Sequence, residues 1–167
     1  MINKAKQTAC THTFPPFINR DSEILILGSF PSVASREAHF YYMHPQNRFW
    51  PVLSFIYKEP VKTLEDKKRL LIKHHIALYD VIEACTITGS SDSSIKDVQP
   101  ADLEELIKNT RINRIYCAGK KAYHLYLKYQ SPKEPLKEIP VYCLSSTSPA
   151  NAAKSIEELI KEWSMIV

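Results

Sequence analysis

Apolar positions along the chain fall into short continuous runs and longer, helically spaced segments. The short runs are almost wholly apolar, which is typical of strands buried on both faces of a parallel sheet. The first and third of them are closed by Gly28 and Gly119. The four predicted strands are Glu23–Leu27, Ala77–Ile82, Arg114–Ala118 and Ile139–Leu144.

The longer segments place apolar residues on one helical face. Thr63 is a predicted N-cap, and Asp66 three residues later completes a capping box. The predicted helices are Asn47–Tyr57, Thr63–His75, Pro100–Asn109, Lys120–Tyr129 and Asn151–Trp163. Strands therefore alternate with helices, which indicates an α/β fold: three α/β/α layers around a four-stranded, mainly parallel sheet.

Ligands of such sheets bind beyond the carboxyl ends of the strands. That rule selects four segments for a site, which begin at Gly28, Glu83, Gly119 and Ser145. The segment after Gly28 is too long for a simple connection, and long loops in compact domains tend to be functional.

A chain of 167 residues fits one domain, here with residues 1–13 as a loosely ordered N-terminal segment. No apolar run approaches the roughly 20 residues of a membrane span. The N-terminus is polar and has no apolar stretch of signal-peptide type. We therefore expect a cytoplasmic monomer with no membrane partner.

The formal net charge of +4 is compatible with a polyanionic partner but does not require one. Four cysteines occur, and no two form a C-x-x-C pair. Cys117 and Cys143 stand in apolar runs, which predicts buried free thiols. Because no metal ligands cluster, we expect neither a metal ion nor another cofactor.

Aromatic residues crowd the segment after the first strand, where Phe40, Tyr41 and Tyr42 are followed by His44 and Asn47. Aromatic rings outside a core can stack a flat ligand such as a base. They can equally form a hydrophobic plug for the loop. His44 is either a general acid or base or a neutral loop histidine. Asn47 either caps the following helix or orients a water with its amide.

Polar loops after the other strands also carry two interpretations. Ser145–Asn151 precede a helix, so they form an anion site for a DNA phosphate or simply cap that helix. Glu83–Asp97 form a polar lid or phosphate contact, or only a solvated loop. Lys120 faces phosphate or is merely exposed. Asp80 lies inside a strand, where an ionisable group needs a partner or a role.

Five blocks together resemble the uracil-DNA glycosylase superfamily, most closely its hypoxanthine (deoxyinosine) glycosylase branch. They stand in family order and span residues 14–163. The blocks read LILGSFPSVASREAHFYYMHPQNRFWPVL, LYDVIEAC, GSSDSSIKD, AGKKAYHLY and LSSTSPANA.

The resemblance implies roles for particular residues. The catalytic Asn of the hypoxanthine branch falls in HPQN, so it implies that Asn47 positions the water. It implies base binding by the first motif and the residues that follow it: Gly28, Ser29, Phe30, Pro31, Tyr41, Tyr42 and His44. It implies DNA contacts from the second motif and its neighbours: Ser145, Ser146, Thr147, Ser148, Pro149, Asn151, Ser91, Ser93 and Lys120.

The implied activity is base-excision repair: hydrolysis of the N-glycosidic bond of a deaminated base in DNA by a monofunctional enzyme, with hypoxanthine as the expected base. Two alternatives stay open. One is a uracil or G:T/G:U mismatch glycosylase, because base choice depends on the shape of the pocket. The other is a non-catalytic nucleotide- or phosphate-binding module, because a fold does not determine a function.

Overall fold

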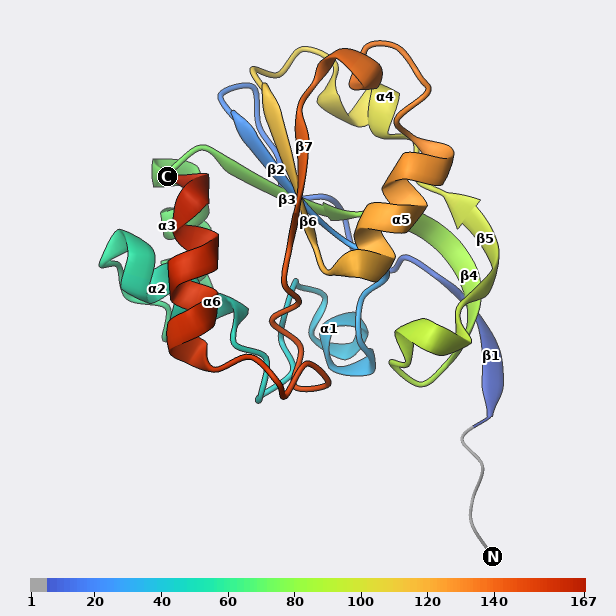
Figure 1. Cartoon of the computed structure of the whole chain (residues 1–167), viewed down its shortest axis with the longest axis horizontal. Helices are drawn as coiled ribbons and strands as arrows, with labels where there is room; N and C mark the ends of the chain where they lie inside the picture. Colours follow the sequence, from blue (N-terminus) through green and yellow to red (C-terminus); the bar gives the residue numbers. More distant parts are fainter. Residues whose placement is uncertain (1–5) are drawn as a thin grey trace, which may run out of the picture.

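A four-stranded parallel sheet runs through the centre of the molecule in the computed structural model, which describes residues 6–167 (Figure 1). Every neighbouring pair in this sheet is parallel, as predicted. The strands Ile24–Gly28 and Ile76–Asp80 are buried at every position, as their continuous apolar sequence requires. In spatial order the strands are β3 (Ile76–Asp80), β2 (Ile24–Gly28), β6 (Arg114–Ala118) and β7 (Val141–Leu144).

Helices cover both faces of this sheet, which confirms the predicted three layers (Figure 1). One face carries α2 (Phe49–Tyr57), α3 (Leu64–Lys73) and α6 (Ile156–Trp163), and the other carries α4 (Leu103–Ile107) and α5 (Lys120–Tyr129). The chain runs from β2 to one side of the sheet and later returns to the other side through β6. The carboxyl ends of β2 and β6 therefore flank a topological switch point, where open α/β sheets bind their ligands.

A second, antiparallel sheet was not predicted. It consists of β1 (Gln7–Thr11), β4 (Ile82–Thr88) and β5 (Lys96–Pro100), in the order β1-β4-β5. The prediction of a loose segment over 1–13 is therefore wrong for residues 7–11, whereas residues 1–5 lie outside the described chain. The prediction of a loop over 83–97 is also wrong, because β4, η1 (Asp92–Ser94) and β5 occupy most of it. One face of such a strand stays polar, so its sequence lacks the continuous apolar signal.

Helix ends differ from the prediction where a cap was overlooked. The last helix begins at Ile156 rather than Asn151, because Ser155 and Glu158 form a capping box. Helix α4 begins at Leu103, after Asp102 accepts a hydrogen bond from the Glu105 amide. The capping box predicted at Thr63 and Asp66 is confirmed. The remaining elements are α1 (Val33–Ala38), η2 (Leu136–Glu138) and η3 (Ser164–Ile166).

The two strand cysteines differ in burial. Cys117 is fully buried on β6, as predicted. Cys143 is exposed, so its predicted burial is wrong. The reason is position: β7 is the edge strand of the parallel sheet, and two of its four residues face solvent.

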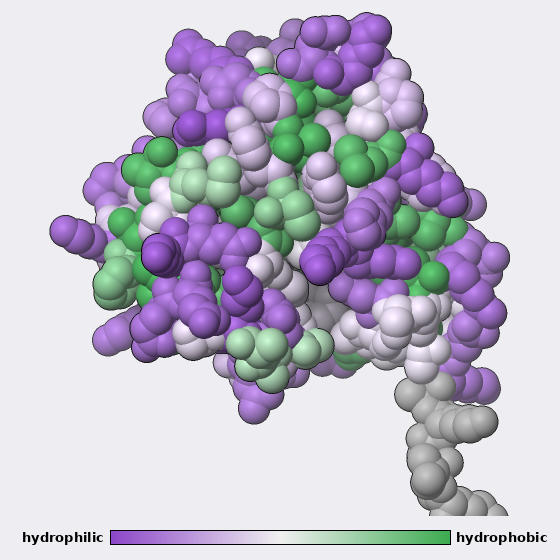
Figure 2. Space-filling model, in the orientation of Figure 1, coloured by the Kyte–Doolittle hydropathy of each residue, from purple (hydrophilic) through white to green (hydrophobic). Residues whose placement is uncertain are grey.

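The face of the molecule in Figure 2 mixes hydrophilic side chains with separate apolar patches. Across residues 6–167, every helix is too short or too polar to cross a membrane.

Candidate active site

A cavity of about 290 Å³ opens at the carboxyl edge of the parallel sheet. Gly28 of β2, Asp80 of β3, Ala118 of β6 and Ser146 beyond β7 all line it, so every strand of the sheet contributes. This volume is near the lower end for small-ligand sites. Its other lining residues are Ser29, Phe30, Pro31, Ser32, Ser35, Tyr41, Tyr42, His44, Asn47, Ser90, Asp92, Thr147, Ser148, Pro149 and Ala150.

The side chain of Asn47 lines this cavity and also accepts from the first amide of helix α2, although the N-cap residue itself is Arg48. The water-orienting role of Asn47 stays a prediction. Its Oδ1 accepts from the Phe49 amide at 2.9 Å and from the Thr147 hydroxyl at 2.8 Å. Because the Phe49 N–H can only donate, Oδ1 rather than Nδ2 must face it. The Nδ2 group donates to no residue among those described, so it is free to donate to a ligand.

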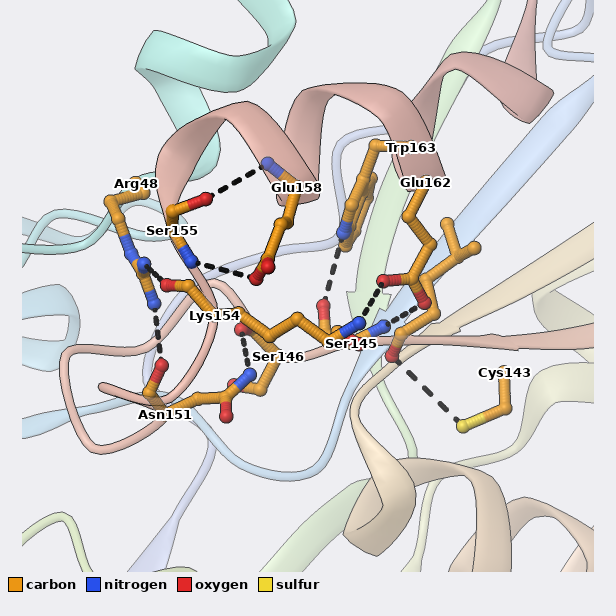
Figure 3. Close-up of polar contacts among 11 residues, drawn as sticks. Arg48, Cys143, Ser145, Ser146, Asn151, Lys154, Ser155, Glu158, Glu162 and Trp163 are labelled. Atoms are coloured by element: carbon orange, nitrogen blue, oxygen red, sulfur yellow. Dashed lines mark hydrogen bonds and ion pairs between the residues drawn. The ribbon is translucent and has the colours of Figure 1, made fainter.

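The loop that carries Thr147 is tied to Asn47 through the next residue, Arg48. The Arg48 guanidinium donates to the backbone carbonyls of Lys154, Asn151 and Ser148 (Figure 3 labels all but Ser148). Its own amide donates to the Thr147 carbonyl at 3.0 Å. One side chain thus fixes the path of a loop that lies about a hundred residues further along the chain.

The two tyrosines predicted to bind the base, Tyr41 and Tyr42, differ in whether their hydroxyls have a hydrogen-bond partner. Tyr41 donates its hydroxyl to the Pro15 carbonyl at 2.9 Å and is a buried core residue, although it lines the cavity. The ring of Tyr42 stacks on Phe49 at 3.8 Å, and its buried hydroxyl has no partner among the described residues. Burial raises the pKa of the Tyr42 hydroxyl well above its usual value, so the group stays neutral. Tyr42 therefore offers the cavity an unused polar group.

The first motif, residues 28–32, forms a wall of the cavity. Ser32 caps α1, and the ring of Phe30 lies under the Arg36 guanidinium at 5.4 Å from its centre. His44 lines the cavity as well, and its Nδ1 accepts from the Gln46 amide at 3.1 Å. That bond leaves the other ring nitrogen of His44 to carry the proton in the neutral state.

A second cavity, of about 540 Å³, adjoins the first and shares Asp92, Ser146, Ser148 and Ala150 with it. Ser145, Asn151 and Lys120 line this neighbour rather than the first cavity. The backbone of Ser145 is already used, because its amide donates to Glu162 and its carbonyl accepts from Trp163 (Figure 3). The predicted DNA-contacting residues of the 145–151 segment and Lys120 are therefore divided between two adjacent cavities.

Residues 89–94, the serine turn, lie across from the Asn47 side. Ser91 and Ser93 are exposed and hydrogen-bond each other at 3.1 Å, outside both cavities. Ser90 and Asp92 line the cavity instead, and neither was singled out from sequence. Asp92 accepts from the Ser29 hydroxyl at 2.6 Å. Desolvation raises the pKa of the Asp92 carboxyl, and the bond from Ser29 opposes that rise.

Asp80, the strand carboxylate without an assigned role, lies in the floor of the cavity and is only 4% exposed. Its Oδ2 pairs with His12 at 2.8 Å. His12 belongs to the segment expected to be loose, so sequence reasoning missed it. The only local signal was that His12 stands two residues before Phe14.

Comparisons with known proteins agree with this geometry. Residues 15–164 match the model of the uracil DNA glycosylase superfamily. A hypoxanthine DNA glycosylase from Methanosarcina barkeri is 38% identical over 114 residues, which cover 65% of this chain and 71% of the relative. One from Methanosarcina acetivorans is 37% identical over 112 residues, with the same coverage.

A solved structure resembles the fold over almost its full length. It is a solution NMR structure of a Methanosarcina acetivorans protein assigned as a uracil DNA glycosylase. The TM-score is 0.75 at 30% identity, and the match covers 92% of this chain and 96% of that one. The family match, the two relatives and the cavity at the sheet edge all indicate the same family. The chain therefore belongs to the uracil DNA glycosylase superfamily and is a DNA glycosylase, a hydrolase of N-glycosyl bonds.

Proposed function

We propose that this DNA glycosylase excises hypoxanthine, the base of deoxyinosine, by means of a water that Asn47 positions. One observation carries the proposal: the Asn47 amide is held at the cavity with its oxygen occupied and its nitrogen unused. Two relatives of moderate identity are hypoxanthine DNA glycosylases, which supports this choice of base.

In the reaction, water adds to C1′ of the deoxyribose while the bond from C1′ to the base nitrogen breaks. The base leaves with the electron pair of that bond and takes up the proton that the water releases, and the sugar is oxocarbenium-like in the transition state. The nucleotide first swings out of the duplex, which costs a few kcal/mol and least for a mispaired base. The cavity at the sheet edge receives it.

The contacts of Asn47 specify how it would hold the water. Both lone pairs of Oδ1 already accept hydrogen bonds, so Nδ2–H donates to the water oxygen. A second lone pair of that oxygen then remains to attack C1′. An amide is a poor base, so the rate comes mainly from positioning and electrostatics.

The first motif is suited to the negative charge of the departing base. The amides of Ser29, Phe30 and Ser32 donate to no other residue within the described chain. All three residues line the cavity. Unpaired N–H groups at the place where negative charge develops stabilise a transition state, as in an oxyanion hole.

The enzyme is monofunctional in this proposal. Within residues 6–167, no lysine lines the cavity, so no amine stands ready to attack C1′ and form a Schiff base. Incubation with borohydride should trap no covalent enzyme–DNA adduct, and the product should be an intact abasic site. A trapped adduct would contradict the hydrolytic route.

A panel of duplex oligonucleotides tests the proposal. Each carries one hypoxanthine, uracil or xanthine, or a G:T or G:U mismatch, and alkaline cleavage reveals the abasic product. We expect excision of hypoxanthine at the highest kcat/KM. Faster excision of uracil or of mismatched thymine would show that those bases, and not hypoxanthine, are the preferred substrates. Tight binding without excision would indicate a non-catalytic module.

A further inference from the structure

Asp80 and His12 form a buried pair beneath the cavity, although they are 68 residues apart. The His12 side chain is completely buried, and its Nε2 lies 2.8 Å from the Asp80 carboxylate. The backbone fixes this position, because the His12 amide donates to the Glu83 carbonyl at 2.7 Å, continuing the β1–β4 pairing.

The surroundings of His12 indicate where its proton lies. Aromatic rings enclose the imidazole, with Phe14 at 4.6 Å and Tyr79 at 4.7 Å between ring centres. Its Nδ1 is buried with no partner among the described residues. A buried N–H without an acceptor is rarer and costlier than an unused lone pair. The proton therefore belongs on Nε2, which donates to Asp80 and leaves Asp80 as the ionised acceptor.

The second oxygen of Asp80 is directed at Gly28. Oδ1 lies 2.5 Å from where a β carbon on residue 28 would stand, and the Tyr42 hydroxyl lies 3.5 Å from the same point. Only glycine leaves this space open, and all three residues line the cavity. Oδ1 makes no hydrogen bond within residues 6–167, so it remains available to a ligand.

An ionised carboxylate accepts hydrogen bonds and cannot donate them. Deamination turns the bare ring nitrogen of adenine or cytosine into a ring N–H beside a new carbonyl. A floor that only accepts therefore pairs with hypoxanthine or uracil, and meets the parent adenine or cytosine lone pair to lone pair. Sites that must pair with an N–H reject analogues without it much more strongly than apolar pockets do.

We propose, on the basis of the function proposed above, that His12 is a positioning residue: its Nε2–H holds Asp80 as an acceptor-only carboxylate that selects bases with a ring N–H. The other ionisable groups facing Asp80 are Tyr79 on its own strand, Tyr41 and Tyr42 from the α1–α2 segment, and Asp92 from the serine turn. Burial raises the pKa of each tyrosine, so the tyrosines stay neutral.

The test compares single-turnover excision of hypoxanthine and N1-methylhypoxanthine, which lacks the ring N–H, by four proteins. His12→Phe keeps an aromatic ring but removes the donor, whereas His12→Gln places an amide N–H near the position of Nε2. Asp80→Asn is a second variant that depends on no change at His12. Thermal unfolding identifies a variant that fails to fold.

We expect the wild type to favour hypoxanthine by about 100-fold or more, because the methylated base cannot donate to Asp80. That preference should fall at least about tenfold in His12→Phe and Asp80→Asn and return in His12→Gln.

An unchanged preference in folded Asp80→Asn would overturn the inference, because rejection of the methyl group would then be steric alone. Equal preference in wild type and His12→Phe would overturn it as well. These results concern the inference only. A wild type that leaves hypoxanthine uncut instead overturns the proposed function, and this inference with it.

Discussion

The two sides of the cavity are built differently. On one side, the clamped wall, Asn47 and Arg48 are tied to residues 146–154 by hydrogen bonds from a guanidinium and from Thr147, which is 1% exposed. On the other side, the serine turn at residues 89–94 is mostly exposed. It is held by bonds from Ser29 and from the Val33 amide, and by Arg36 on the Gly89 carbonyl.

The contrast concerns how much each wall can move. In the clamped wall, a charged guanidinium binds three carbonyls of the loop, and the buried Thr147 of that loop donates to the Asn47 oxygen. These bonds hold Asn47 in place before substrate arrives. The serine turn is mostly exposed and buries little surface, so that segment can open at smaller cost. We infer that the clamped wall serves the chemical step, whereas the serine turn adapts to the DNA backbone.

The largest effect should follow removal of the Asn47 amide. Asn47→Ala should reduce kcat on hypoxanthine-containing DNA by about 100-fold or more, the scale for a lost electrostatic group. The control is Gln46→Ala, an exposed neighbour that does not line the cavity. Single-turnover kinetics measure both. Near-normal turnover in Asn47→Ala would remove this residue from its role.

Loss of the clamp should come next. Arg48→Met leaves three carbonyls without their charged donor, so the free energy of unfolding should fall by about 2 kcal/mol. Excision should fall about tenfold, since the loop that holds Asn47 loses its anchor. Urea unfolding measures the free energy of unfolding, and single-turnover kinetics measure the excision rate. Arg69→Met is the control, because Arg69 makes only an exposed ion pair and should change stability little. Equal losses of stability in Arg48→Met and Arg69→Met would show that the hydrogen bonds of Arg48 to the loop do not stabilise the fold.

Loss of the Thr147 hydroxyl should have a smaller effect on kcat. Thr147→Val preserves the shape of the side chain but removes the hydroxyl that donates to Asn47. A lost hydrogen bond of about 1 kcal/mol corresponds to roughly fivefold in kcat. Thr147→Ser keeps the donor and serves as the matched control. Identical kcat values for the two variants would show that the bond contributes nothing to catalysis.

The smallest effect belongs to the serine turn. Because the pKa of Asp92 is raised in the folded protein, stability should decline as pH rises from the usual aspartate range through the raised value. Above that interval the carboxylate is charged and repels phosphate. Asp92→Asn should therefore bind DNA about twofold more tightly at neutral pH. Fluorescence anisotropy against pH measures this difference, which should vanish at acidic pH; a pH-independent difference would contradict it.

Sequence alone determined the parallel sheet, its helical layers and the edge that carries the cavity. Four apolar runs separated by amphipathic segments can bury their surface in few other ways, and parallel strands bring their carboxyl ends together. Residues 146–149 follow the last run, and Tyr42 and Asn47 lie in the long segment after the first, so position placed them at this edge, whereas the resemblance implied their roles.

Only the tertiary structure decided which polar groups meet inside the cavity. The antiparallel sheet carries no continuous apolar signal, so nothing in the sequence placed His12 beneath Asp80. The same holds for Thr147 on Asn47, Asp92 on Ser29 and the carbonyls around Arg48. Hydrophobic periodicity reports which face of an element is buried. A hydrogen bond between residues a hundred positions apart depends on how the chain folds back, which no local pattern records.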